Sequence, residues 1–137
     1  MIIDDDEDDR ILFAEALAEV DGSYALMTAV NGEQALELLQ KLETTLPDFV
    51  FLDLNMPRMN GWQCLSHLRK MAKLKDVPII IYTTSQADEH VQKAKDNRAT
   101  YFLTKPPKFK DLVHAIFYVL NMKWEQVAKL NGTLYKR

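Results

Sequence analysis

An unbroken run of six acidic residues, 4–9, follows two aliphatic residues at the start of the chain. Polar side chains that could do chemistry also end later apolar stretches, at Asp53, Thr83 and Lys105. Carboxylates brought close together raise each other's pKa, and a bound divalent cation removes that conflict. Oxygen ligands favour a hard cation, and a few carboxylates completed by water suit Mg²⁺, for which Mn²⁺ should substitute. The residue types therefore predict a magnesium site beside a hydroxyl and an ammonium group.

Short apolar runs alternate with amphipathic stretches along the chain, which is typical of βαβ units and a parallel sheet. We expect strands at residues 2–3, 25–30, 49–54, 79–83 and 101–104. The second helix has Asn31 as its N-cap and carries one apolar stripe, formed by Ala35, Leu38, Leu39 and Leu42. One five-stranded, doubly wound α/β domain is the fold that this pattern predicts.

The last predicted helix is long for a compact domain. Its apolar face begins at Leu112 and continues through Trp124 and Val127 to a stop at Asn131-Gly132. We divide the chain into a domain of residues 1–121 and a C-terminal helical extension or tail of residues 122–137. The stripe of this extension could fold back on the domain or pair with another chain, so a homodimer is one expectation.

Ligands of doubly wound folds bind outside the carboxyl ends of the strands. The first strand ends at Asp4-Asp5, the third at Asp53 and the fourth at Thr83-Thr84. The fifth ends at Lys105, which precedes Pro106. Fold geometry alone therefore brings carboxylates, hydroxyls and an ammonium group to one edge of the sheet.

Composition excludes several other classes of protein. With 137 residues, 47% of them hydrophobic, the chain can bury a core, so disorder is not expected. Seventeen basic residues against twenty acidic ones give a net charge of −3 without a basic stripe, which argues against nucleic-acid binding. The single cysteine, Cys64, allows no internal disulfide, and no stretch has the length of a membrane span or a signal-peptide core. We expect a cytoplasmic protein.

Four stretches in this order, IIDDDEDDR, FLDLNMPRMNG, PIIIYTTS and FLTKP, together resemble the receiver domain of CheY-like two-component response regulators. The resemblance extends over residues 1–121. It implies a flavodoxin-like sheet with the strand order 2-1-3-4-5. It also implies a signalling domain that receives a phosphoryl group from a histidine kinase or a phosphotransfer protein, and that catalyses only its own phosphorylation and slow dephosphorylation.

The resemblance assigns a role to each polar strand end. Asp53 would be the phosphoacceptor, and Asp4 and Asp5 would hold Mg²⁺ together with Asp53 and the backbone carbonyl of Asn55. Lys105 would bind a phosphoryl oxygen. The family often has a cis peptide bond after this lysine, which we expect here before the proline that comes next in the chain.

The resemblance also implies a switch between two conformations. Thr83 would bind a phosphoryl oxygen and follow it on activation, beside Thr84, where the family prefers a small residue. Phe102 would move inward with Thr83 and change the face formed by the fourth helix, the fifth strand and the fifth helix. This face would then bind a protein target.

The acidic run permits a simpler interpretation for most of its members. Residues 6–9 would cap and charge the first turn of the first helix, where negative charge is favourable, rather than add metal ligands. Asp4 and Asp5 could serve the same capping role, and the register of the pair is open by one residue because Asp6 is adjacent. Because only Met1 and two isoleucines precede Asp4, we expect either a short first strand or a sequence that lacks its true start.

Three rival functions remain. A Mg²⁺-dependent phosphatase with an aspartyl nucleophile usually has a second Asp two residues after the first, where this chain has Asn55. A nucleotide-binding module needs a glycine-rich loop after the first strand, which Gly22, Gly32, Gly61 and Gly132 do not form. A receiver fold that signals by binding alone is disfavoured because every key residue is present.

The three histidines, His67, His90 and His114, have no partner at metal-ligand spacing.

Overall fold

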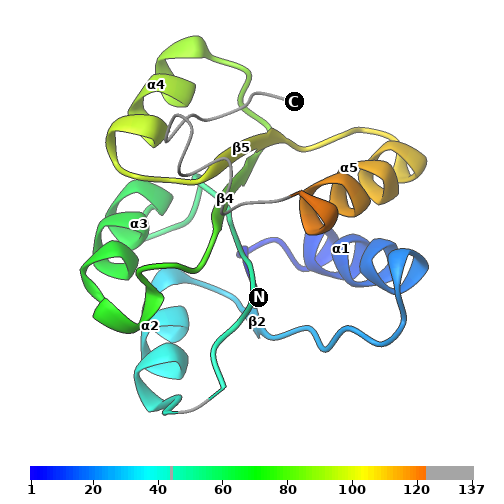
Figure 1. Cartoon of the computed structure of the whole chain (residues 1–137). Helices are drawn as coiled ribbons and strands as arrows, with labels where there is room; N and C mark the ends of the chain where they lie inside the picture. Colours follow the sequence, from blue (N-terminus) through cyan, green and yellow to red (C-terminus); the bar gives the residue numbers. More distant parts are fainter. Residues whose placement is uncertain (44, 123–137) are drawn as a thin grey trace.

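The computed structural model describes residues 1–43 and 45–122. Five parallel strands form one sheet in the order β2-β1-β3-β4-β5. Helices α2, α3 and α4 cover one face of the sheet, and α1 and α5 cover the other (Figure 1). The predicted fold class and strand order are confirmed. In chain order the elements are β1 (Ile2–Ile3), α1 (Glu7–Val20), β2 (Thr28–Ala29), α2 (Gly32–Lys41), β3 (Val50–Leu52), α3 (Gly61–Lys70), a 3₁₀ turn η1 (Ala72–Leu74), β4 (Ile79–Thr83), α4 (Asp88–Asp96), β5 (Tyr101–Thr104) and α5 (Phe109–Asn121).

The sheet separates two apolar clusters, because successive side chains of a strand point to opposite faces. Under α1 and α5 the rings of Phe13, Phe51 and Tyr82 pack edge to face, with centroids 4.7 to 6.2 Å apart. The other cluster lies under α2, α3 and α4 and includes Ile81 and Cys64. Cys64 is fully buried there and packs as a small apolar residue.

Three neighbouring strands of the sheet are short. The central strand β1 has two residues, and it pairs with β2 on one side and with β3 on the other. Strand β2 was expected over residues 25–30 but covers only Thr28–Ala29, because its single neighbour offers no longer partner. Strand β3 was expected over residues 49–54 and covers Val50–Leu52. The predicted order of strands is therefore right, while the predicted lengths of two are too long.

The predicted start of the second helix is correct, whereas the last helix ends earlier than predicted. Asn31 caps α2, its side chain accepting the backbone N–H of Gln34 at 2.8 Å. Helix α5 ends at Asn121, and Met122 has extended backbone, with φ −74° and ψ 140°. The helix therefore does not run unbroken into the predicted extension, whose residues 123–137 lie outside the described residues. None of the helices in the described ranges combines the length and apolar character that crossing a membrane requires.

The start of α3 packs directly against the backbone that carries Asp53. Asn60 and Gln63 form a capping box, with two side chain to backbone bonds of 3.0 Å each. The N–H of Gly61 donates to the carbonyl of Leu54 at 2.9 Å. A Cβ on Gly61 would overlap the carbonyl oxygen of Asp53 and lie 2.6 Å from the Cα of Leu54. Both obstacles are backbone atoms, so this close approach requires glycine.

We predict that Gly61→Ala lowers the free energy of unfolding by about 2–3 kcal/mol, because either the helix or the Asp53 backbone must shift. Gly22→Ala is the matched control, since a Cβ there meets only the carbonyl oxygen of Ala18 at 3.9 Å. Urea denaturation of both variants measures the difference. Equal losses in the two variants would contradict the role given to Gly61.

Candidate functional site

Three predicted metal ligands meet at the carboxyl edge of the sheet. Asp4 and Asp5 come after β1, and Asp53 comes after β3, the neighbouring strand. One carboxylate oxygen from each lies within 4.8 Å of the others. Asp4 and Asp53 are buried, with exposed fractions of 0% and 5%, whereas Asp5 is exposed. Within the described ranges no other set of His, Cys, Asp and Glu has this geometry.

The backbone fixes the two buried carboxylates despite the shortness of β1. The N–H of Asp4 donates to Ala29 O at 3.1 Å, and the N–H of Asp53 donates to Ile3 O at 3.0 Å. Strand-like hydrogen bonding thus continues one residue beyond the assigned strands. The guanidinium of Arg10 also donates to the carbonyl of Asp4 at 2.8 Å.

Lys105 brings a positive charge from the end of β5 into this group. Its Nζ lies 2.8 Å from Asp4 Oδ2, 2.7 Å from Asp9 Oδ2 and 3.7 Å from Asp53 Oδ1. The described chain contains no cis peptide bond, so the bond before Pro106 is trans and the expected cis form is wrong. Trans is the intrinsically favoured form of such bonds.

Burial dominates the electrostatics of the site. The pKa of Asp53 is raised to about 6, mainly by loss of hydration; the charge of Lys105 opposes this rise, and the charge of Asp4 adds to it. Burial also raises the pKa of Asp4, although the hydrogen bond from Lys105 opposes this. Burial alone would lower the pKa of Lys105, but its bonds to Asp4 and Asp9 raise that pKa well above the usual value. One ammonium shared among several carboxylates cannot fully offset the burial of each.

The remaining predicted residues occupy different positions around the carboxylates. Thr83 ends β4 and is fully buried, and its hydroxyl accepts the N–H of Ser85 at 3.3 Å. Thr84 and Asn55 are exposed and line the cavity above Asp53. Phe102 lies in β5, fully buried on the α2, α3 and α4 face. The described conformation therefore holds Phe102 at the inward end of its expected movement.

The first turn of α1 caps the helix, as predicted, and also binds Lys105, which was not predicted. Asp6 is the N-cap, and its side chain accepts the N–H of Asp9 at 3.0 Å, which confirms the capping prediction at this position. The carboxylate of Asp9 also binds Lys105, which the sequence interpretation missed. The capping pattern does not show which way this turn faces, so it gave no signal for the contact with Lys105.

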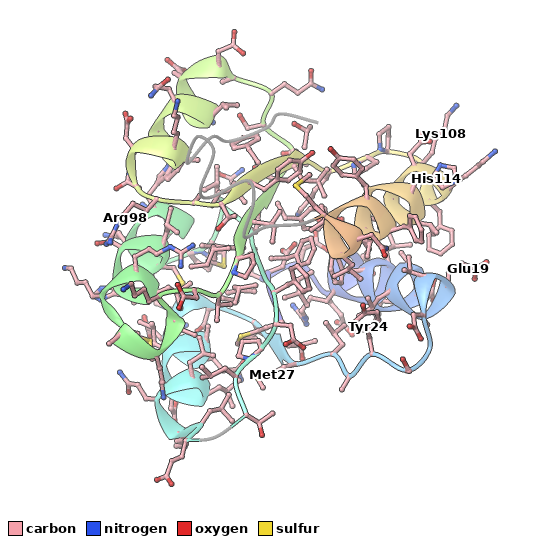
Figure 2. All side chains as sticks on the ribbon, viewed as in Figure 1. Glu19, Tyr24, Met27, Arg98, Lys108 and His114 are labelled. Atoms are coloured by element: carbon pink, nitrogen blue, oxygen red, sulfur yellow. The ribbon has the colours of Figure 1, made fainter. Side chains whose placement is uncertain are left out.

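Two cavities of similar size differ in lining. One of about 610 Å³ lies over the acidic residues and is lined by Asp5, Asp6, Glu7, Asp8, Asp9, Asp53, Asn55, Thr84 and Lys105. The other, of about 600 Å³, has a mainly apolar lining that includes Phe13, Phe49 and Leu120. Tyr24 and Met27, on the segment between α1 and β2 (Figure 2), also line the second cavity. Of the two, the first offers the groups suited to a cation or a phosphoryl group.

We predict that Asp53→Asn stabilises the fold at pH 7 when divalent cations are chelated, by about 1–3 kcal/mol. The carboxyl ionises near pH 4 in an unfolded chain and near pH 6 here, so its contribution to stability falls as the pH rises between these values. The gain should therefore shrink when urea denaturation is repeated below pH 5. Asp76→Asn, at an exposed carboxylate, controls for the lost charge. A gain that grows in acid would disprove the explanation.

The comparisons with known proteins agree with this arrangement. A sequence model described as the response regulator receiver domain matches residues 1–117. The probable methanogenesis regulatory protein FilR2 of Methanothrix harundinacea is 27% identical over 119 residues, which cover 85% of this chain and 77% of that protein. Response regulator Rcp1 of Synechocystis is 27% identical over 116 residues, covering 82% of this chain and 79% of that protein.

Solved structures lead to the same family. The crystal structure of the Mn²⁺-bound form of Rcp1 gives a TM-score of 0.76 at 25% identity, covering 90% of this chain and 92% of that one. Chemotaxis protein CheY4 of Vibrio cholerae gives 0.73 at 30% identity, with 86% and 94% covered. Receiver domains are signalling domains of two-component systems, where they interact with histidine kinases and downstream partners. The match over residues 1–117, with the sheet order and the strand-end residues described above, shows that this chain belongs to the family of response regulator receiver domains.

Proposed function

We propose that the chain accepts a phosphoryl group on Asp53 from a histidine kinase or a phosphotransfer protein, and passes the signal to a protein target. One observation carries this proposal: a buried carboxylate ends a central strand with an ammonium 3.7 Å away and two further carboxylates beside it. A buried acid with a purely structural role would not need two further carboxylates and an ammonium beside it. Phosphorylation is also the chemistry for which such a set of charges is suited.

The donor set fits a divalent cation. Asp4, Asp5 and Asp53 each offer an oxygen ligand, and hard oxygen ligands with room for water favour Mg²⁺, for which Mn²⁺ can substitute. The backbone carbonyl of Asn55, a residue that lines the same cavity, is the proposed fourth protein ligand. The solved Rcp1 relative is a Mn²⁺-bound form, which supports this assignment. A bound cation would neutralise part of the charge on the transferring phosphoryl group.

The side chains supply the remainder of the proposed chemistry. Asp53 Oδ1 accepts the N–H of Leu54 at 2.9 Å, which fixes the orientation of the nucleophile. As the phosphorus–oxygen bond to Asp53 forms, the bond from phosphorus to the donor's histidine nitrogen breaks, and the leaving imidazole takes up a proton. Lys105 would donate to one phosphoryl oxygen. Thr83 would donate to another after its hydroxyl leaves the N–H of Ser85. Slow attack by water on phosphorus would later restore the carboxylate and release phosphate.

The phosphatase alternative is less well supported. It would use the same acceptor, but it needs a general acid or base close to the nucleophile to speed hydrolysis. The position two residues after Asp53 is Asn55, whose amide cannot exchange a proton in that way. A long-lived acyl phosphate, and therefore a signal rather than fast turnover, is the outcome that this site favours.

We expect incubation with acetyl phosphate and Mg²⁺ to add one phosphoryl group to the folded protein. The adduct should be absent in Asp53→Asn and should not form when the cation is chelated before acetyl phosphate is added. Intact-mass spectrometry measures both effects. An adduct that persists in the variant would place the acceptor elsewhere, and a folded parent protein without any adduct would contradict the proposed function.

The proposed output face consists of α4, β5 and α5. A groove of about 500 Å³ on this side is lined by Thr104, Lys105, Asp111 and His114, the last of which is labelled on α5 in Figure 2. Lys105 lines both this groove and the acidic cavity, so a movement of its side chain at the site would be felt at the groove. The proposed switch residues, Thr83 at the end of β4 and Phe102 in β5, are buried behind this face. A homodimer and a cytoplasmic location stay predictions.

Helix α4 should respond first to phosphorylation. It buries one residue of its own, Ala94, and its N-cap residue Ala87 has no side-chain capping bond, so it is held weakly. We predict that acetyl phosphate with Mg²⁺ changes amide hydrogen exchange in residues 88–104 of the parent protein and not of Asp53→Asn. Exchange measured by mass spectrometry on peptic peptides tests this. No change in a fully phosphorylated sample would rule out this output face.

A further inference from the structure

Asp9 forms a second ion pair with the lysine of the acidic site. The distance from Lys105 Nζ to Asp9 Oδ2 is 2.7 Å, as short as the contact with Asp4 and well below the 3.7 Å to Asp53. The lysine side chain is 10% exposed and that of Asp9 is 32% exposed, so the pair is partly shielded from water. In the described conformation the ammonium is therefore held more closely by α1 than by the proposed phosphoacceptor.

The position of Asp9 is fixed by the helix that carries it. Its N–H donates to the N-cap side chain of Asp6 at 3.0 Å, in the first turn of α1. Asp4, in contrast, directly follows β1, the strand next to β3, which Asp53 follows, and it is fully buried. The two short contacts of Lys105 thus come from different elements, one beside Asp53 and one from a helix above the sheet.

A phosphoryl group on Asp53 would compete with the carboxylates of the site for the ammonium of Lys105. Charge-assisted hydrogen bonds form at about 2.7–2.9 Å, whereas Lys105 Nζ is 3.7 Å from Asp53 Oδ1. Movement toward a phosphoryl oxygen keeps the lysine near Asp4, which neighbours Asp53 in the sheet. The contact that we expect to lengthen is therefore the one with Asp9.

We propose that Asp9 is a positioning residue that holds Lys105 away from Asp53 and so slows phosphorylation. The inference rests on the proposed function, because it acts through the lysine of that site. The first turn of α1 would then limit the rate at which the domain is phosphorylated. Loss of the Asp9 charge should therefore make the site more reactive, whereas damage to an active site would make it less reactive.

The experiment compares three variants with acetyl phosphate and Mg²⁺. Asp9→Asn should raise the initial rate of adduct formation about fivefold, as expected for the loss of a partly exposed ion pair. Asp8→Asn removes the same charge from the same helical turn, at an exposed residue without an ion pair to Lys105, and should change the rate less than about twofold. Asp9→Glu keeps the carboxylate and should return the rate to near that of the parent.

The possible outcomes separate this inference from the proposed function. A parent protein that forms no adduct would overturn the function itself. A parent that forms the adduct while Asp9→Asn behaves like Asp8→Asn would overturn the inference alone, since only bulk charge would then matter. A slower rate in Asp9→Asn, with thermal unfolding unchanged, would also overturn it, because Asp9 would then align the lysine rather than restrain it.

Discussion

Two carboxylates buried at neighbouring strand ends impose the main physical constraint on this domain. Removing a charge from water is costly unless the charge is paired and hydrogen-bonded. Asp4 and Asp53 are both buried, and their carboxylate oxygens lie close enough together to bind one cation. Several otherwise separate features reduce that cost. Lys105 enters from the end of another strand, backbone N–H groups donate to the carboxylates, and α1 turns its N-terminus toward them.

The compensation is incomplete, and this is what makes the site useful. The pKa of Asp53 remains raised, so the metal-free protein carries a carboxylate that is disfavoured in its charged form. Any ligand that neutralises the group gains from relieving this cost, and functional sites commonly trade stability for reactivity in this way. If the site binds a cation as proposed, part of the binding free energy would come from relieving the unfavourable burial of these charged side chains.

The order of polar and apolar residues was enough to predict which side chains lie at the strand ends. It was not enough to predict contacts that depend on how one helix is rotated against the sheet. Asp4, Asp53 and Lys105 could be assigned because each directly ends an apolar run, and parallel strands end at one edge. The bond between Asp9 and Lys105 depends on how α1 is turned about its axis, which the capping pattern does not encode. Strand lengths failed for a similar reason, because the pairing of β2 is limited by its neighbour β1 and not by its own residues. Thr83 and Thr84 are chemically alike, yet the first is buried and the second is exposed over the acidic cavity, a difference of register that composition leaves open.

The contact of Gly61 with the Asp53 backbone has a consequence for how such a domain can diversify. Because the helix start is fixed against the strand end, the loop between them is tied down at both of its ends. Pro57 and Arg58 lie exposed within that loop. A change of side chain on this loop would therefore alter the protein surface there while the backbone of Asp53 keeps its place. Gly61 thus separates the loop surface, which side chains can alter, from the backbone that positions Asp53.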